Sequence, residues 1–320
     1  MRSKQIVRPP KLGKGSRVAL VAPAGPLLER DDLTRAEALC RALDYEPALG
    51  KNAYARHGYL AGTDEERLSD FNSALSDPSI DAIWCIRGGY GSIRLLDQID
   101  YQALVARPRI VIGFSDITAV LNAITQLTGL VTFHGPVARS SMSAYTRRHF
   151  ERVLSQADSP GRLERIPDPT GVLIPKENRI VAVKGGVAEG RLVGGNLTLL
   201  QCLVGTPYFP NLAGAILFLE DVGEDLYRVD RMLAHLRLCG ALRHLAGVLI
   251  GRFTQLERFG RDGALGFDEV LANYFAPLGI PVAYGFPVGH IEDQWTLPLG
   301  VLARLDADAG ELDVLESAVV

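Results

Sequence analysis

Short apolar runs alternate with amphipathic segments through the first half of the chain. The runs have the length of a buried strand, and the segments between them carry apolar side chains at helical spacing. Parallel strands need helical crossovers, so this alternation predicts a parallel, helix-flanked sheet. The apolar runs cover residues 17–22, 80–86, 110–112 and 130–133, and the amphipathic segments cover residues 31–43, 64–75 and a stretch that begins at Asp116.

Proline and polar residues concentrate between residues 158 and 177, where they mark a linker. The part of the chain after the linker is more mixed, with one long helical segment from Asp225 to Cys239. Its strand-length apolar runs cover residues 190–193, 215–219, 247–250, 281–284 and 301–305. A chain of 320 residues, 47% of them hydrophobic, is long enough for two cores. We therefore predict an N-terminal domain over residues 1–157, a linker over 158–180 and a C-terminal domain over 181–320.

The residues Gly113-Phe-Ser-Asp116 connect an apolar run to the amphipathic segment that follows it. Ser115 therefore stands at the carboxyl end of a buried strand, where open α/β sheets gather their active sites. It also stands at a helix N-terminus, whose unpaired N–H groups can hold a developing oxyanion. These properties fit a nucleophile, whereas capping of the helix by Ser115 or Asp116 explains the same residues equally well.

A carboxylate and a histidine follow apolar runs in the second half of the chain. Glu220 ends one such run, and a loop rich in glycine and proline presents His290 after another. A serine, an acid and a histidine are the components of an acyl-transfer triad. Spacing alone leaves the choice of acid open, because three further acidic residues lie close by: Asp221, Glu224 and Asp225.

Six short motifs resemble those of the LD-carboxypeptidases, a family of serine peptidases that includes muramoyl-tetrapeptide carboxypeptidase and the microcin C immunity peptidases. The motifs are Val21-Ala-Pro-Ala-Gly25, Trp84-Cys-Ile-Arg-Gly-Gly-Tyr-Gly91, Gly113-Phe-Ser-Asp116, Gly194-Gly-Asn196, Leu219-Glu-Asp221 and Phe286-Pro-Val-Gly-His290. They occur in the family's order and span most of the chain. The resemblance implies that Ser115 is the nucleophile, Glu220 the orienting acid and His290 the general base.

The same resemblance implies a Rossmann-like N-terminal domain joined to a smaller, swivelling β/α C-terminal domain, and a homodimer. The implied activity is release of the terminal D-alanine from a murein tetrapeptide during cytoplasmic peptidoglycan recycling. The bond cut is the amide between the L-centre of meso-diaminopimelate and D-alanine. The alternative within the family is cleavage of a peptide–nucleotide antibiotic of the microcin C type, which confers self-immunity and requires an aromatic or basic feature that grips a base.

A glycine cluster, Arg87-Gly-Gly-Tyr-Gly91, follows the apolar run at 80–86. It lacks the spacing of a dinucleotide-binding or Walker motif, so we do not expect a nucleotide there. Glycine lets the backbone approach a ligand and expose N–H groups, and acyl transfer needs two such donors near the oxyanion. We predict that the N–H groups of Gly89 and Asp116 form this oxyanion hole. A cluster that only makes a turn is the alternative.

An exopeptidase must also bind the terminal carboxylate of its small peptide substrate. Arg87, Gly88 and Asn196 are candidates by their proximity to the motifs, and structural hydrogen bonds explain them equally well. His134, after a strand-length run, competes with the later histidine as a base or substrate contact, or else lines the domain edge. The other histidines stand in charged or helical contexts, and we expect them at the surface: His57, His149, His235 and His244.

Composition narrows the class of protein further. A formal charge of −3 offers no basic surface for nucleic acid or an acidic membrane. No apolar stretch approaches a membrane span and no signal-peptide segment follows the N-terminus, so we expect a cytoplasmic protein without a membrane partner. The cysteines lack the spacing of a metal site, so we expect no metal or organic cofactor and buried, reduced thiols at Cys40, Cys85, Cys202 and Cys239.

Two other classes of protein fit parts of the pattern. An α/β-hydrolase esterase shares the order serine, acid, histidine, but Ile117 stands where its Gly-x-Ser-x-Gly motif has the second glycine. The second class is a non-catalytic two-domain binding protein. In such a protein Ser115 would be unreactive, and a covalent serine probe would not label it.

Overall fold

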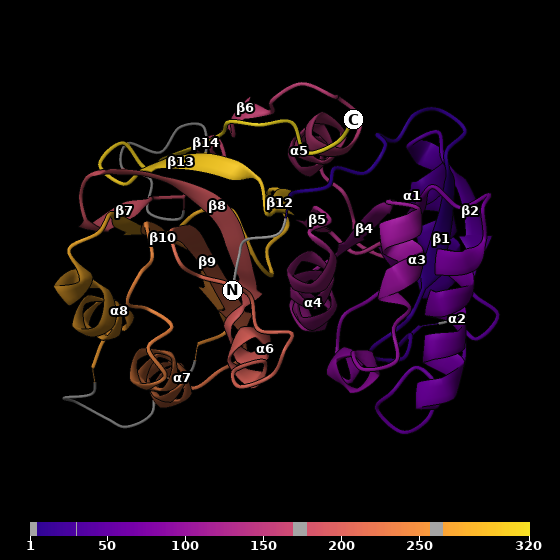
Figure 1. The fold of residues 1–320 in the computed structure, drawn as a ribbon, viewed down its shortest axis with the longest axis horizontal. Coiled ribbons are helices and arrows are strands. Elements are labelled where there is room, and N and C mark those ends of the chain that lie inside the picture. Colours follow the sequence, from indigo (N-terminus) through magenta and orange to yellow (C-terminus); the bar gives the residue numbers. More distant parts are fainter. Residues whose placement is uncertain (1–4, 30, 169–177, 257–264) are drawn as a thin grey trace.

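The computed structural model describes residues 5–29, 31–168, 178–256 and 265–320. This part of the chain forms two sheets, with the helix α4 (Thr118–Thr128) between them (Figure 1). Within it, none of the helices has the length and apolar character needed to span a bilayer.

The first sheet has the strand order β12-β5-β4-β3-β1-β2 and is parallel except at β12. Its central strands are almost completely buried apolar runs, as expected for a parallel sheet covered on both faces. The strands are β1 (Arg17–Val21), β2 (Glu46–Leu49), β3 (Ala82–Cys85), β4 (Ile110–Gly113), β5 (Thr132–His134) and β12 (Leu297–Leu299). The helices besides α4 are α1 (Asp31–Ala42), α2 (Asp64–Ser76), α3 (Tyr101–Ala106) and α5 (Ala144–Leu154), with short 3-10 helices at Ser92–Leu95 and Ser115–Ile117.

The second sheet has the order β6-β14-β13-β8-β9-β10-β11-β7, with a parallel centre from β8 to β11 and antiparallel edges. Helices α6, α7 and α8 bury an apolar core against this sheet (Figure 1). The strands are β6 (Gly161–Arg162), β7 (Val181–Lys184), β8 (Val187–Asn196), β9 (Ala215–Val222), β10 (Gly247–Thr254), β11 (Val282–Tyr284), β13 (Leu302–Asp306) and β14 (Glu311–Val314). The helices are α6 (Leu197–Cys202), α7 (Leu226–Leu238) and α8 (Phe267–Phe275), followed by a 3-10 helix at Ala276–Leu278.

The strand order of the first sheet reverses between β1 and β3, because β2 lies outside β1 whereas β4 and β5 follow β3. In open parallel sheets, ligands bind at such a point, outside the carboxyl ends of the two strands. The segments that leave these strands touch here, since the N–H of Gly25 donates a 3.0 Å hydrogen bond to the carbonyl of Gly88. The turn that carries Ser115 follows the next strand along, β4.

The predicted α/β class and the parallel, helix-flanked first sheet are confirmed, and the predicted runs of the second half form strands. The long helix predicted from Asp225 to Cys239 is confirmed as α7, and the shorter helix α8 was not predicted. β12 leaves the second half of the chain to pair with β5, and β6 lies inside the predicted linker yet pairs with β14. The domain boundaries at residues 157 and 181 stay a prediction.

The four cysteines are free thiols in two different settings. Cys40 and Cys85 are buried, as predicted. The prediction of burial is wrong for Cys202 and Cys239, which are exposed because they lie at the carboxyl ends of α6 and α7.

Candidate active site

Ser115 occupies a strained turn between β4 and α4. Its φ angle is +62°, in the left-handed region that non-glycine residues rarely adopt. The turn leaves no room for side chains on two glycines: a Cβ on Gly113 would come within 2.8 Å of Ile117, and one on Gly88 within 3.1 Å of Ser115 Oγ. The sharp turn presents the hydroxyl at the end of the strand, as a nucleophile requires.

The capping interpretation of this turn is wrong. Phe114 precedes the short 3-10 helix and Ile117 precedes α4, and neither helix start has a side-chain cap. The carboxylate of Asp116 instead accepts the N–H of Ser92 at 2.8 Å, and the Ser92 hydroxyl donates to the Asp116 carbonyl at 2.6 Å. Burial raises the pKa of Asp116, against the hydrogen bonds from Ser92 and Gly91. Sequence reasoning missed Ser92, although it directly follows the glycine cluster.

The glycine cluster approaches Ser115 from the end of β3. Gly89 has a φ of +120°, and a Cβ there would lie 2.9 Å from the Cα of Gly25. The N–H of Gly89 donates no hydrogen bond to another described residue, so it is free for a ligand. Arg87 donates one N–H of its partly buried guanidinium to the Pro26 carbonyl. The cluster thus holds two chain segments together as well as making a turn.

Glu220 and His290 form the carboxylate–imidazole pair of the second sheet. The side chain of Glu220 points from β9 into a fully buried position, and its Oε2 accepts a 2.8 Å hydrogen bond from His290 Nδ1. Burial raises the pKa of Glu220, against the hydrogen bond from His290. Gly289, at φ +121°, allows the approach, because a Cβ there would lie 3.0 Å from Glu220 Oε2.

The His290 ring lies beside the turn that carries the serine. Its centroid is 4.8 Å from that of Phe114, the residue before Ser115. Nδ1 is engaged by Glu220, so Nε2 is the atom left to accept a proton. No hydrogen bond joins Ser115 to His290 among the described residues; such catalytic contacts often tighten only when substrate binds.

The acidic neighbours of Glu220 have other partners. Asp221 accepts hydrogen bonds from Asn196 Nδ2 at 2.8 Å and from the hydroxyl of Thr198 at 2.9 Å. Asp225 precedes α7 and pairs with Arg228, without capping the helix through its side chain. Of these carboxylates, Glu220 is the one that pairs with His290. Asn196 also caps α6 through its Oδ1, so its side-chain amide is already engaged inside the protein.

His134 is separated from the solvent. The residue is fully buried, neither ring nitrogen has a hydrogen-bond partner among the described residues, and its nearest rings are Phe218 at 5.2 Å and Phe114 at 5.9 Å. Burial lowers the pKa of His134 to about 3. An imidazole without a carboxylate partner or access to solvent does not fit the role of base or substrate contact.

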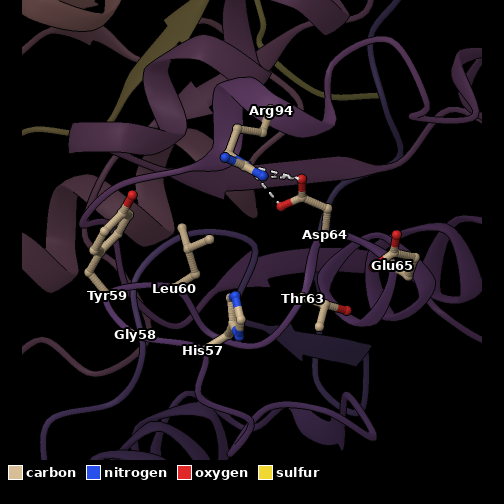
Figure 2. Close-up of a pocket in the computed structure, with 8 residues that line it drawn as sticks. All are labelled: His57, Gly58, Tyr59, Leu60, Thr63, Asp64, Glu65 and Arg94. Carbon is tan, nitrogen blue, oxygen red and sulfur yellow. Dashed lines mark hydrogen bonds and ion pairs between the residues drawn. The ribbon is translucent and has the colours of Figure 1, made fainter.

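The prediction that the remaining histidines lie at the surface is wrong for His149. The amphipathic helix α5 turns this residue toward the core, where its Nδ1 lies 3.0 Å from the Tyr145 carbonyl. His57 is exposed, as predicted, and lines a cavity of about 390 Å³ together with Arg94 and Asp64 (Figure 2). The described residues contain no cluster of three or more side chains that could hold a metal ion.

Comparison with known proteins matches both halves of the chain to one family. Residues 18–135 match the LD-carboxypeptidase N-terminal domain, and residues 189–305 match the LD-carboxypeptidase C-terminal domain. The murein tetrapeptide carboxypeptidase of Pseudomonas aeruginosa is 38% identical over 303 residues, covering 91% of this chain and 94% of that protein.

Solved structures agree with the sequence comparison. The crystal structure of muramoyltetrapeptide carboxypeptidase from Oxalobacter formigenes matches with a TM-score of 0.80 and 32% identity, over 94% of this chain and 99% of that one. The microcin C7 self-immunity protein MccF matches with a TM-score of 0.88 and 26% identity, over 98% of this chain and all of that one. The chain therefore belongs to the LD-carboxypeptidase family and is a serine-type carboxypeptidase.

Proposed function

We propose that the protein releases the terminal D-alanine of a murein tetrapeptide, by hydrolysis of its amide bond to the L-centre of meso-diaminopimelate. The observation that carries the proposal is the Glu220–His290 pair, set at the end of the second sheet beside the strained turn of Ser115. A 38% identical relative is named murein tetrapeptide carboxypeptidase, which supports this choice of substrate.

In the proposed reaction, neutral His290 removes the proton of Ser115 as the hydroxyl attacks the scissile carbonyl. Glu220 holds the imidazole in one tautomer and stabilises the imidazolium that forms. The N–H groups of Gly89 and Asp116 stabilise the oxyanion, because one is unpaired and the other stands in the first turn of a helix. The amine leaves with the proton from His290, and water then cleaves the acyl-enzyme in the same way.

We assign the terminal carboxylate of the substrate to Arg87. Among the described residues, the hydrogen bond of its guanidinium goes to the Pro26 carbonyl, which leaves its other N–H groups for charge-assisted hydrogen bonds. Gly88 contributes through its backbone, because it packs directly against Ser115. The internal partners of Asn196 support a role for this residue in holding Asp221 rather than the substrate.

We place this reaction in the cytoplasm, in peptidoglycan recycling, and expect a homodimer, as the family resemblance implies. Light scattering on the purified protein tests the dimer, which a monomeric mass would contradict.

A second candidate is cleavage of a peptide–nucleotide antibiotic. The exposed rings of Tyr59 and Tyr90 favour it, because they lie 5.3 Å apart next to the glycine cluster and offer aromatic faces to a base. MccF has been solved in complex with aspartyl sulfamoyl adenosine, and its fold matches this chain.

Mass spectrometry of separate incubations with murein tripeptide, tetrapeptide and pentapeptide tests the main proposal. We expect loss of one alanine from the tetrapeptide alone, and none with Ser115→Ala. Cleavage between the two terminal D-alanines of the pentapeptide would contradict the assigned bond. Aspartyl sulfamoyl adenosine, incubated in parallel, tests the second candidate.

A further inference from the structure

Arg67 is a buried charged side chain among the helices that cover the first sheet. It lies on α2, and none of its side chain is exposed. Its Nη1 donates to two main-chain carbonyls, those of Pro23 and, at 2.9 Å, Gly91. Burial of a guanidinium is costly unless its N–H groups are paired, and Arg67 pairs both terminal nitrogens while its Nε has no partner among the described residues.

The counter-ion of Arg67 is shared with a second arginine. Asp64, one turn earlier on α2, accepts a hydrogen bond from Arg67 Nη2. Its carboxylate also accepts hydrogen bonds from Arg94, at 2.7 Å from Nη2 and 3.0 Å from Nε (Figure 2). The side chain of Arg94 is 47% exposed and that of Arg67 is not exposed at all. One carboxylate thus binds a buried and an exposed guanidinium.

The two carbonyls that Arg67 binds belong to the segments that leave β1 and β3, and β3 is the strand that pairs with β4, which leads to Ser115. Pro23 lies in the segment that leaves β1, where Gly25 donates to the Gly88 carbonyl. Gly91 ends the glycine cluster, and Ser92, the next residue, is bonded to Asp116 through both its N–H and its hydroxyl. The arginine therefore holds one end of the stretch that contains Gly89 directly, at Gly91, and is linked to the other end through Pro23, two residues before Gly25.

We propose that Arg67 is a positioning residue that holds the glycine cluster so that the Gly89 N–H faces the oxyanion formed at Ser115. It touches neither the substrate nor the reacting atoms. A guanidinium suits the position because its planar set of donors reaches two carbonyls and a carboxylate from one buried centre, which an ammonium or an amide does not. The inference rests on the proposed function, since it assumes that Ser115 is the nucleophile.

The variant Arg67→Met removes the donors and keeps much of the aliphatic volume. We expect kcat to fall about 100-fold, the effect of displacing a catalytic group by roughly 1 Å, with KM changed by less than about threefold. Arg94→Met is the matched control, because it also removes a guanidinium from Asp64, but an exposed one that forms no hydrogen bond with the glycine cluster in the described part of the chain. We expect its kcat and KM to stay within about threefold of the wild-type values.

A readout without peptide substrate separates positioning from general loss of structure. A fluorophosphonate forms a tetrahedral adduct on the nucleophilic serine, whose oxygen occupies the oxyanion hole. We expect folded Arg67→Met to react about 100-fold more slowly than wild type, with a full final stoichiometry of labelling, and Arg94→Met to react at the wild-type rate. Added guanidine at millimolar concentration should restore part of the rate to Arg67→Ala and none to Arg94→Ala.

If Arg67→Met does not fold, Arg67→Lys takes its place, because it keeps the charge and loses the ability to reach all three acceptors. Its expected loss in kcat is at least about tenfold. The inference is overturned if the folded Arg67 variant keeps kcat and the labelling rate within about threefold, or if Arg94→Met loses as much. A wild-type enzyme that reacts with the probe but leaves the tetrapeptide intact contradicts the proposed substrate only, and the labelling rates still decide the role of Arg67.

Discussion

The Cα of Gly88 faces Ser115 so closely that a Cβ on the glycine would lie 2.9 Å from Ser115 Cβ and 3.1 Å from its Oγ. The backbone of the glycine cluster therefore packs directly against the Ser115 side chain. The contact joins the end of β3 to the turn after β4, and it explains why a residue without a side chain stands at position 88.

The variant Gly88→Ala tests this contact. We expect kcat to fall at least about tenfold, because the new methyl group must displace either the cluster or Ser115 from its position. Gly13→Ala is the control, since a Cβ there meets no atom within 4 Å and the φ angle of Gly13 is not positive. Steady-state kinetics of both variants provide the measurement. Equal activity of the two variants would contradict the claim that the contact between Gly88 and Ser115 is needed for activity.

Replacement of Glu220 by glutamine separates function from stability. Burial raises the pKa of this carboxyl, so the folded chain binds its proton more tightly than the unfolded chain does. The stability that Glu220 contributes is therefore lost as pH rises through the raised pKa, and its charge is a cost to folding at neutral pH. We expect Glu220→Gln to keep or raise Tm at pH 7.5, while kcat falls roughly 10²- to 10⁴-fold.

Thermal unfolding and kinetics on the same preparation check both halves of this prediction. The advantage in Tm should shrink at acidic pH, where Glu220 is protonated in the wild type. A variant that loses stability at neutral pH while it keeps kcat would contradict the role of Glu220.

The activity should fall as the pH is lowered. The base must be neutral to accept the serine proton, and protonation of the Glu220–His290 pair removes it. Burial raises the pKa of Glu220, so Glu220 is protonated at a higher pH than an exposed glutamate would be. Its protonation therefore contributes to the loss of activity. We expect a shallower acid limb of kcat/KM in Glu220→Gln. A wild-type profile that stays flat from neutrality to about pH 5 would exclude a histidine base.

His134 should affect stability rather than chemistry. Burial lowers its pKa to about 3 in the folded chain. Below about pH 6.5, the unfolded chain therefore binds a proton at this residue that the folded chain does not bind. The stability of the fold should therefore decrease as pH falls from about 6.5, by about 2 kcal/mol at pH 5 from this residue alone. His134→Leu should remove this part of the pH dependence and retain kcat within about tenfold.

Urea unfolding at pH 8 and pH 5 measures the difference. An identical pH dependence in wild type and His134→Leu would show that another group is responsible. A loss of kcat comparable to that of His290→Ala would restore His134 as a candidate base.

The elements that the sequence predicts best are the buried parallel strands. β1, β3 and β4 are continuous apolar runs bounded by helical segments, and a strand buried on both faces has no other pattern. β2 is an edge strand with partly exposed residues and a proline, and β12 has three residues in the sequence Leu-Pro-Leu. Short edge strands carry little pattern of their own, because their pairing is decided by distant parts of the chain.

The motifs that carry the candidate site are visible in the sequence, whereas its geometry is not. Glu220 and His290 stand 70 positions apart, and the fold brings their side chains to 2.8 Å by placing the loop after β11 against β9. The left-handed φ of Ser115 has no residue signature, since serine rarely adopts it. In the sequence, Arg67 looks like an ordinary exposed charged residue of an amphipathic helix, and only the structure shows that it is buried.

The central claim is that Ser115 and His290, whose ring lies 4.8 Å from that of Phe114, act as one catalytic unit. Its most direct test is the release of D-alanine from murein tetrapeptide by Ser115→Ala, His290→Ala and the double variant, with Glu224→Gln as the control. We expect each single variant to lower kcat by several orders of magnitude and the double variant to be little worse, because each removes the same nucleophilic step. Additive losses, or wild-type turnover by a folded Ser115→Ala, would contradict it.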